Sequence, residues 1–298
     1  MSLFDQVVDQ ALHNRPELNA LRVVVEKELL HHDIMLALSA AGLLAKLTFI
    51  GGTCLRACYG SNRLSEDLDF TGGADFDREH LAELARVLVA TLKGKYGLEV
   101  EVSEPLRDIG NVDTWKIKVQ TRPGRKDMPA QRINIDVCSI PSYQPTPMVL
   151  LNPYGVDMGT GGLLLMAQTL EEIYADKIVA FALRPNRIKN RDLWDLAWLR
   201  QQGVKPRLDL IASKLADHRC ERSAFLGLFK ERSERLETDD SLAVGFRAEM
   251  SRFLPRDLVV QTVDDPAFWV FLAGHVRQLY QLTARTLGGE PDRVGFKM

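Results

Sequence analysis

Two aspartates separated by a single residue, Asp67 and Asp69, have the types and spacing that most directly suggest chemistry. Side chains two positions apart on a β-strand point to the same face, so both carboxylates would project together while Leu68 and Phe70 enter the core. Two carboxylates this close repel each other, and a cation is what keeps both ionised at neutral pH. Ligands that offer only oxygen suit Mg²⁺, which takes one or two carboxylates together with substrate phosphates.

A third carboxylate, Asp136, belongs to a run of residues that alternates with a period of two. Ile133, Ile135 and Val137 share one face of the predicted strand, so Asp136 stands on the other face. If this strand lies beside the one that carries Asp67, three carboxylates converge and can hold two metal ions. Two metal ions activate an attacking oxygen and stabilise the leaving oxygen in an in-line displacement at phosphorus. The alternative, in which each aspartate is only a solvated strand residue or a turn former, is disfavoured by this combination.

The turn Gly51-Gly52-Thr53 precedes the aspartate pair and follows a predicted strand over 47–50. A strand that enters such a turn and leaves it as a helix places free backbone N–H groups and a hydroxyl at a helix N-terminus, which suits phosphate. Glycine also lets the backbone approach a phosphate closely. The turn is no P-loop, because the pattern GxxxxGK[ST] is absent, and taken alone it is a weak signal.

Other polar and basic residues near these motifs are candidates for contacts with phosphate. Arg63 and Ser65 stand just before the aspartate pair and could contact a triphosphate, although Arg63 could equally be a surface residue. Two basic segments could seat an RNA backbone, although a basic loop is usually only a solvated one. The segments contain Arg122, Arg125, Lys126 and Arg132, and Arg184, Arg187, Lys189 and Arg191.

The predicted helix over 188–199 is apolar around most of its circumference, yet it carries Asp192 and Asp195 one turn apart. Buried carboxylates need partners. The nearest cations in the sequence are Lys177, Lys189 and Arg191. Two interpretations remain open: an ion-pair network that docks the helical part on the sheet, or a Lys177 that binds the triphosphate while one aspartate orients it or the incoming substrate.

These residues need a sheet and helices to position them, and hydrophobic periodicity indicates where those elements lie. Helices are expected over 16–41 and from residue 75 or 77 to about 95, and strands over 47–50, 65–70, 98–102, 114–121 and 132–140. From about residue 167 to residue 287 only helical spacing recurs. We therefore expect an α+β chain with an α/β domain over 1–165 and an all-helical domain over 166–298, packed together.

Composition excludes several classes of protein. The chain has 298 residues, of which 46% are hydrophobic and 26% charged, so it is neither disordered nor fibrous. The formal net charge of −2 argues against a protein that holds nucleic acid by bulk electrostatics. The first residues lack the pattern of a signal peptide, and the most apolar stretch is too short to span a bilayer. We expect a cytoplasmic protein without a membrane partner.

The motifs together resemble a known family. Ile50-Gly51-Gly52-Thr53, Asp67-Leu68-Asp69 and Ile135-Asp136-Val137 are similar to the hG[GS]…DhD…hDh signature of the DNA polymerase β-like nucleotidyltransferase superfamily. The fuller string over 49–70 resembles the AbiEii/AbiGii toxin family more closely. That resemblance extends to the segments 172–177 and 187–195, so it covers roughly residues 30–200.

The resemblance implies a fold, a reaction and partners. The fold would be a polymerase β-like mixed sheet with flanking helices. The reaction would transfer NMP from an NTP, with Mg²⁺ as cofactor, to the 3′ end of a tRNA or to a protein hydroxyl, and would release pyrophosphate. The protein would be the toxin of a type IV toxin–antitoxin or abortive-infection system, with a genetically linked antitoxin that represses transcription and need not contact the toxin.

Roles for individual residues follow from the motifs and the resemblance together. Asp67 and Asp69 would hold both metal ions, and Asp136 would bind the catalytic ion and help to deprotonate the acceptor hydroxyl. Lys177 is the fourth catalytic candidate. Candidates for binding the nucleotide are Gly51, Gly52, Thr53, Arg63, Ser65, Asp192 and Asp195.

The sequence allows two alternative functions. A small-molecule nucleotidyltransferase of the antibiotic-modifying type would use the same chemistry, and an acidic acceptor pocket would favour it for a cationic drug. A nucleotide-binding or interaction module without catalysis would need no metal cluster, and the complete set of three aspartates argues against it.

Overall fold

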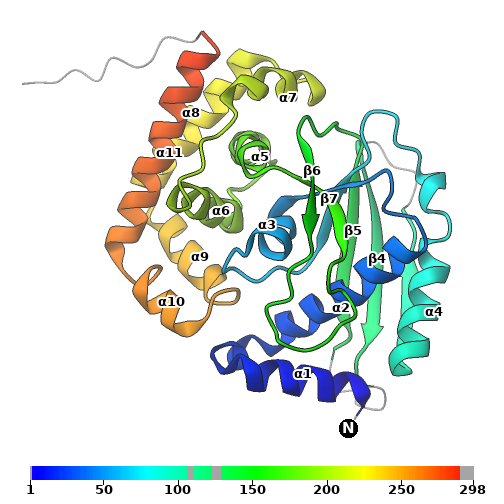
Figure 1. Ribbon diagram of the computed structural model, residues 1–298. Helices are drawn as coiled ribbons and strands as arrows, with labels where there is room; N and C mark the ends of the chain where they lie inside the picture. Colours follow the sequence, from blue (N-terminus) through cyan, green and yellow to red (C-terminus); the bar gives the residue numbers. More distant parts are fainter. Residues whose placement is uncertain (1, 106–109, 123–128, 289–298) are drawn as a thin grey trace, which may run out of the picture. The chain divides into compact units, whose positions relative to one another are not determined.

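The computed structural model describes residues 2–105, 110–122 and 129–288 (Figure 1). The chain divides into two compact units, which we name the sheet unit and the helical unit. The sheet unit consists of Met1–Thr169 and Phe253–Asp257, and the helical unit of Leu170–Arg252 and Leu258–Met298. The sheet unit thus takes a short segment from the part of the chain that the sequence assigns to the helices. None of the helices in these described ranges is both long and apolar enough to cross a membrane.

The sheet unit is built on one mixed sheet in the order β3-β4-β5-β2-β1-β7-β6. β2 runs parallel to β5 and β1 parallel to β7, while the other neighbouring pairs are antiparallel. This mixed sheet confirms the expected α+β class. The strands are β1 (Thr48–Ile50), β2 (Leu68–Thr71), β3 (Glu99–Ser103), β4 (Val112–Gln120), β5 (Gln131–Cys138), β6 (Pro145–Val149) and β7 (Leu164–Gln168).

Helices cover this sheet and close its core. They are α1 (Leu3–Asn14), a 3₁₀ segment (Pro16–Leu21), α2 (Arg22–Ala40), α3 (Gly51–Tyr59), a second 3₁₀ segment (Arg78–Leu81) and α4 (Leu84–Tyr96). α2 and α4 pack on each other and on β5 and β3, as Figure 1 shows. Leucines of both helices are buried, and so are Phe49, Leu68 and Ile135 of the strands, which are no more than 1% exposed. Alternation along the strands therefore leaves the opposite face to the polar residues.

Several elements differ from the sequence-based expectation. The helix expected over 16–41 begins as a 3₁₀ turn at Pro16, and α1 precedes it, capped by the Ser2 hydroxyl. Neither β6 nor β7 was expected, and β6 contains Pro145 and Pro147. Proline cannot donate to a ladder and is tolerated at an edge strand, and β6 is the last strand of the sheet.

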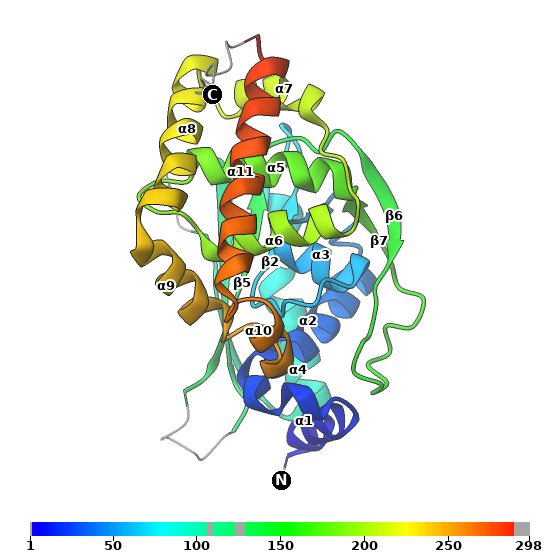
Figure 2. The ribbon, with the colours of Figure 1, turned by 90° about the vertical axis from the view of Figure 1, so that its left-hand side faces the viewer.

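The helical unit contains no strand within its described residues, which agrees with the expected helical C-terminal region. The expected boundary between residues 165 and 166 falls inside β7. Its helices are α5 (Leu170–Leu183), α6 (Asn190–Gln201), α7 (Ile211–Asp217), α8 (Arg222–Thr238), α9 (Asp240–Met250) and α11 (Pro266–Thr286), with α10 (Arg256–Gln261) at its border. α8 lies beside α11, as Figure 2 shows. Phe229 packs on Phe181 and Tyr280 with ring centroids 5.6 Å apart in each pair, so aromatic contacts join α5, α8 and α11.

Candidate active site

The strands that carry the aspartates are neighbours in the sheet. β2 pairs with β5 in parallel, and Asp69 stands directly opposite Asp136 in the register. Residues paired in this way point to the same face with their Cβ atoms close together. The condition named for convergence, that the strand of Asp136 lies beside the strand of the aspartate pair, is therefore met. Ile135 and Val137 alternate with Asp136 and are buried on the other face.

Each of the two outer carboxylates is held by a neighbouring strand. Asp67 lies one residue before β2, and its Oδ1 accepts a hydrogen bond of 3.0 Å from the backbone N–H of Asn134. The hydroxyl of Thr114 on β4 donates to Oδ1 of Asp136 at 2.6 Å. All three aspartates are partly buried. In the part of the chain that the structure describes, no group of three or more His, Cys, Asp or Glu side chains is arranged to hold a metal ion.

Gly51 brings the first turn of α3 against Asp69. β1 pairs with β2 so that Ile50 stands opposite Asp69, and Gly51 follows with φ +77°. A Cβ atom at Gly51 would lie 2.6 Å from Oδ2 of Asp69, closer than any real contact. The sharp turn and the close approach both require glycine here. The first backbone N–H groups of α3, which have no partner within the helix, thus start next to the aspartates.

The side chains of Thr53 and Ser65 are buried under this turn. Their hydroxyl oxygens lie 2.6 Å apart, and the Thr53 hydroxyl donates a short hydrogen bond to the backbone carbonyl of Asp67. Arg63 is only 3% exposed and donates through Nη1 to the carbonyl of Leu64 at 3.0 Å. The alternative that Arg63 is a surface residue is therefore wrong, because its guanidinium is used inside the loop.

Lys177, Asp192 and Asp195 form an ion cluster inside the helical unit. Nζ of Lys177 lies 2.7 Å from Oδ1 of Asp192 and 2.8 Å from Oδ2 of Asp195, so α5 and α6 are joined by two ion pairs. Arg184 adds a third at 3.1 Å. Burial alone would raise the pKa of Asp192, but the charges of Lys177, Arg184 and Lys189 outweigh it and hold that pKa below its ordinary value.

The two basic segments are less exposed than their composition indicates. Arg122 pairs with Glu26, and Arg191 lies 3.5 Å from Glu249. Burial lowers the pKa of Lys189, whereas Arg187 is exposed. Arg132 is exposed as well, while Arg125 and Lys126 lie outside the described residues. Several of these cations therefore serve ion pairs within their own unit.

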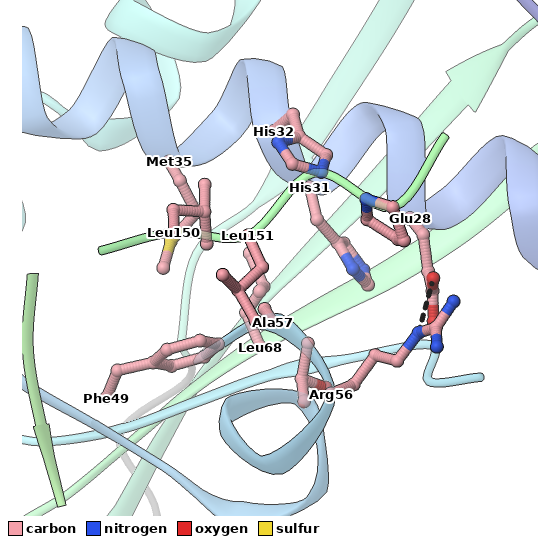
Figure 3. A pocket seen from close by; sticks show the side chains of 12 residues that line it. Glu28, His31, His32, Met35, Phe49, Arg56, Ala57, Leu68, Leu150 and Leu151 are labelled. Carbon is pink, nitrogen blue, oxygen red and sulfur yellow. Dashed lines mark hydrogen bonds and ion pairs between the residues drawn. The ribbon is translucent and has the colours of Figure 1, made fainter. Parts of the chain in front are cut away.

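Glu28, which none of the sequence motifs includes, lies in a buried polar cluster on α2. Figure 3 shows Glu28 beside Arg56, and both line a cavity with His31 and His32; its volume of about 20 Å³ has room for about one water molecule. This cavity is too small for a nucleotide. The available signal was helical spacing, because Glu28 falls on the same side of α2 as Val25 and His32, which are also buried.

Comparisons with known proteins bear on the family. A family model described as the nucleotidyl transferase AbiEii toxin of type IV toxin–antitoxin systems matches residues 33–273. No curated protein matches the chain. MenT4, a nucleotidyltransferase toxin from Mycobacterium tuberculosis H37Rv, is similar in structure with 17% identity and a TM-score of 0.57, over 94% of this chain and 89% of that one. JHP933 from Helicobacter pylori has 17% identity and a TM-score of 0.47, over 89% and 93%.

Proposed function

The chain belongs to the AbiEii family of nucleotidyltransferase toxins from type IV toxin–antitoxin systems, and we propose that it transfers NMP from an NTP to a hydroxyl acceptor with release of pyrophosphate. Membership of this family makes the protein a transferase enzyme with an NTP substrate and an antitoxin as partner. The fold that it shares with MenT4 is consistent with this membership.

One observation carries the assignment of the active site. Asp69 and Asp136 stand side by side on β2 and β5, directly next to the glycine that opens α3. We propose that the backbone N–H groups of Gly51, Gly52 and Thr53 bind the phosphates, because a helix N-terminus favours anions. The acceptor hydroxyl would then lose its proton to Asp136. Ser65 and Arg63 would complete the site from its buried side.

The chemistry of the donor set supports a magnesium site. Asp67, Asp69 and Asp136 offer only carboxylate oxygens and are partly buried, and Asp69 and Asp136 are paired across β2 and β5. Hard oxygen ligands of this kind suit Mg²⁺, and we propose that these three aspartates hold two ions. When bound, such ions neutralise phosphate charge and make the attacking hydroxyl more acidic.

The ion cluster of the helical unit is proposed to serve the same reaction. Lys177 would contact the triphosphate, and Asp192 and Asp195 would orient its ammonium group. Support for the orienting role comes from the two ion pairs of 2.7 and 2.8 Å, which hold Nζ from two sides. A charged group fixed in this way loses little freedom when it meets a phosphate.

The acceptor that we propose is the 3′ end of a tRNA or a protein hydroxyl. The test is incubation of the full chain with each α-labelled NTP and Mg²⁺, with total tRNA in one reaction and protein extract in another. The wild type should label one of these acceptors, while Asp69→Asn and Asp136→Asn should not. Asp75→Asn, in an exposed loop after β2, is the matched control and should label normally. Failure of the wild type to label either acceptor, or full labelling by Asp69→Asn, would refute the proposal.

A further inference from the structure

We propose that Glu28, on α2, is a positioning residue for nucleotidyl transfer: its carboxylate holds the segment 64–67, which leads into the strand of the aspartate pair. The inference rests on the proposed function, because it takes Asp67 and Asp69 as the residues to be positioned. Glu28 lies on a different helix from the phosphate turn and has no place in the motifs that identify the family.

Glu28 is 5% exposed, and its two carboxylate oxygens have different hydrogen-bond partners. Oε1 accepts a hydrogen bond of 2.8 Å from the backbone N–H of Ser65. Oε2 lies 3.1 Å from Nε of Arg56 on α3, the contact drawn in Figure 3, and also accepts a short hydrogen bond from the hydroxyl of Tyr154. Oε2 thus binds Arg56 and Tyr154, and Oε1 binds the segment 64–67 before the aspartates.

The segment 64–67 has no regular secondary structure, so its backbone groups need partners from elsewhere. The N–H of Leu64 donates to the carbonyl of Phe253 at 2.9 Å, and the N–H of Ser65 donates to Glu28. The carbonyl of Glu66 lies 3.0 Å from Nε2 of His31, and the carbonyl of Asp67 accepts from Thr53.

Four successive residues are therefore held one by one, and α2 supplies two of the four anchors. Glu28 and His31 are three residues apart, so they project from the same face of that helix. Lys27 adds an ion pair of 2.7 Å to the side chain of Glu66. The geometry points to α2 as the helix that holds the segment 64–67, which leads to Asp67 and Asp69.

A carboxylate is the group that this position requires. The backbone N–H of Ser65, Nε–H of Arg56 and the hydroxyl of Tyr154 are three donors aimed at one side chain. A carboxylate only accepts, so it satisfies all three, whereas an amide would turn two N–H donors toward at least one of them. Mutation of a residue that positions catalytic ligands through hydrogen bonds typically lowers activity about 10- to 100-fold.

Asp33 provides a matched control on the same helix. Its carboxylate is 2% exposed and accepts from Nζ of Lys95 at 2.5 Å and from the hydroxyl of Tyr96 at 2.8 Å. Asp33 and Glu28 are thus both buried, and each pairs with one cation and one tyrosine. The partners of Asp33 lie on α4, however, and none belongs to the segment 64–67. Asp33→Asn thus controls for the removal of a buried carboxylate from α2, while only Glu28 acts on the aspartates.

The first measurement compares turnover in Glu28→Gln and Asp33→Asn at saturating NTP and Mg²⁺, with thermal unfolding of each variant. We expect kcat of Glu28→Gln to fall at least about 10-fold. Asp33→Asn should retain kcat within about threefold, whatever its Tm, because the partners of Asp33 do not reach the segment. Equal loss of kcat in both variants, or an unchanged kcat in Glu28→Gln, would overturn the proposal. If Glu28→Gln does not fold, Glu28→Asp, which keeps the charge on a shorter stem, is compared in its place.

The second measurement does not depend on activity. Amide hydrogen exchange should become faster over residues 61–69 in Glu28→Gln and stay as in the wild type in Asp33→Asn. Unchanged exchange in Glu28→Gln would overturn the positioning role whatever the activity. If the wild type transfers no nucleotide but exchange rises in Glu28→Gln alone, the proposed function fails and the anchoring of the segment by Glu28 stands.

Discussion

Gly51 matters to the candidate site because its position has no room for a side chain. The residue joins β1 to α3 at φ +77°, and its α-carbon faces the carboxylate of Asp69. Any larger residue would push this carboxylate aside or move the start of the helix. A glycine-glycine turn is common in proteins, so the turn alone is weak evidence for a functional site. The close approach of Gly51 to Asp69 is what links this turn to the aspartates.

Gly51→Ala should therefore abolish most activity. A Cβ atom 2.6 Å from Oδ2 of Asp69 must displace one of the two groups, and a displacement of about 1 Å in an active site can cost about 100-fold in rate. Gly42→Ala is the control, because Gly42 has φ +73° but nothing within 4 Å of the added Cβ. Both variants should lose about 1–2 kcal/mol of stability to the backbone strain, and only Gly51→Ala should lose activity in the NMP-transfer assay. Normal activity in Gly51→Ala would contradict the site.

Helices α5 and α6 are joined through charge as well as through apolar contact. Asp192 and Asp195 are no more than 2% exposed, and Lys177 is 9% exposed. The sequence left open whether this cluster is structural or functional. Within the helical unit it joins two helices, which a structural cluster would also do, so burial does not separate the two interpretations.

A pair of variants can separate them. Lys177→Gln should lower the free energy of unfolding by about 3–5 kcal/mol, because it leaves two buried carboxylates short of positive charge. The double variant Lys177→Gln/Asp195→Asn removes one charge of each sign and should recover most of that loss. Urea unfolding followed by the fluorescence of Trp194 and Trp198, both buried on α6, measures the effect.

Activity distinguishes the roles once stability is restored. If Lys177 contacts the triphosphate as proposed, the double variant should be folded and still nearly inactive. Recovery of activity together with stability would show instead that the cluster only joins α5 to α6.

Both units bury a histidine in its neutral form. Burial, with the neighbouring His31 as the second cause, lowers the pKa of His32 in the sheet unit to about 4. Burial also lowers the pKa of His275 in the helical unit to about 4, with Arg200 as the second cause. His32 lies 2.9 Å from the Thr160 hydroxyl through Nδ1.

Lowering the pH should therefore destabilise the protein already at pH values above those at which most carboxylates titrate. The unfolded state binds protons at these histidines below about pH 6.5, while the folded state resists until about pH 4. The free energy of unfolding then falls as the pH falls from 6.5 toward 4, by about 2 kcal/mol per histidine at pH 5. Calorimetry at pH 7.5, 6 and 5 should show a smaller decline for His32→Asn. The exposed His13→Asn should decline like the wild type, and equal slopes for all three proteins would refute this assignment.

The net charge of the molecule conceals how its charges are used. A formal charge of −2 averages over buried ion clusters, the aspartates of β2 and β5, and exposed residues such as Arg187. Arg122 is an example, because it pairs with Glu26 of α2 rather than with solvent. Bulk charge therefore says little about partners, and the acceptor must be found by experiment.

Much of the fold was predictable because it is encoded over short stretches. Period-two alternation located β5 and the face on which Asp136 stands, and helical spacing located α2, α4 and the helical unit. The pairing of β2 with β5, which places Asp69 opposite Asp136, was named from the sequence only as a condition for the aspartates to converge. β6 escaped because an edge strand tolerates two prolines, which read locally as a loop.

The local order of residues was enough to identify the aspartate pair, the glycine turn and the chemistry that such groups perform, since each depends on spacings of a few positions. The partners of buried charges were not accessible in this way. Glu28 meets Ser65, which is 37 residues away, and Tyr154, which is 126 residues away. For Asp192 and Asp195 the sequence offered three candidate cations, and only the structure shows that Lys177 pairs with both. Such contacts arise only when distant segments pack, because a buried charge pairs with whatever the completed fold brings within hydrogen-bonding distance.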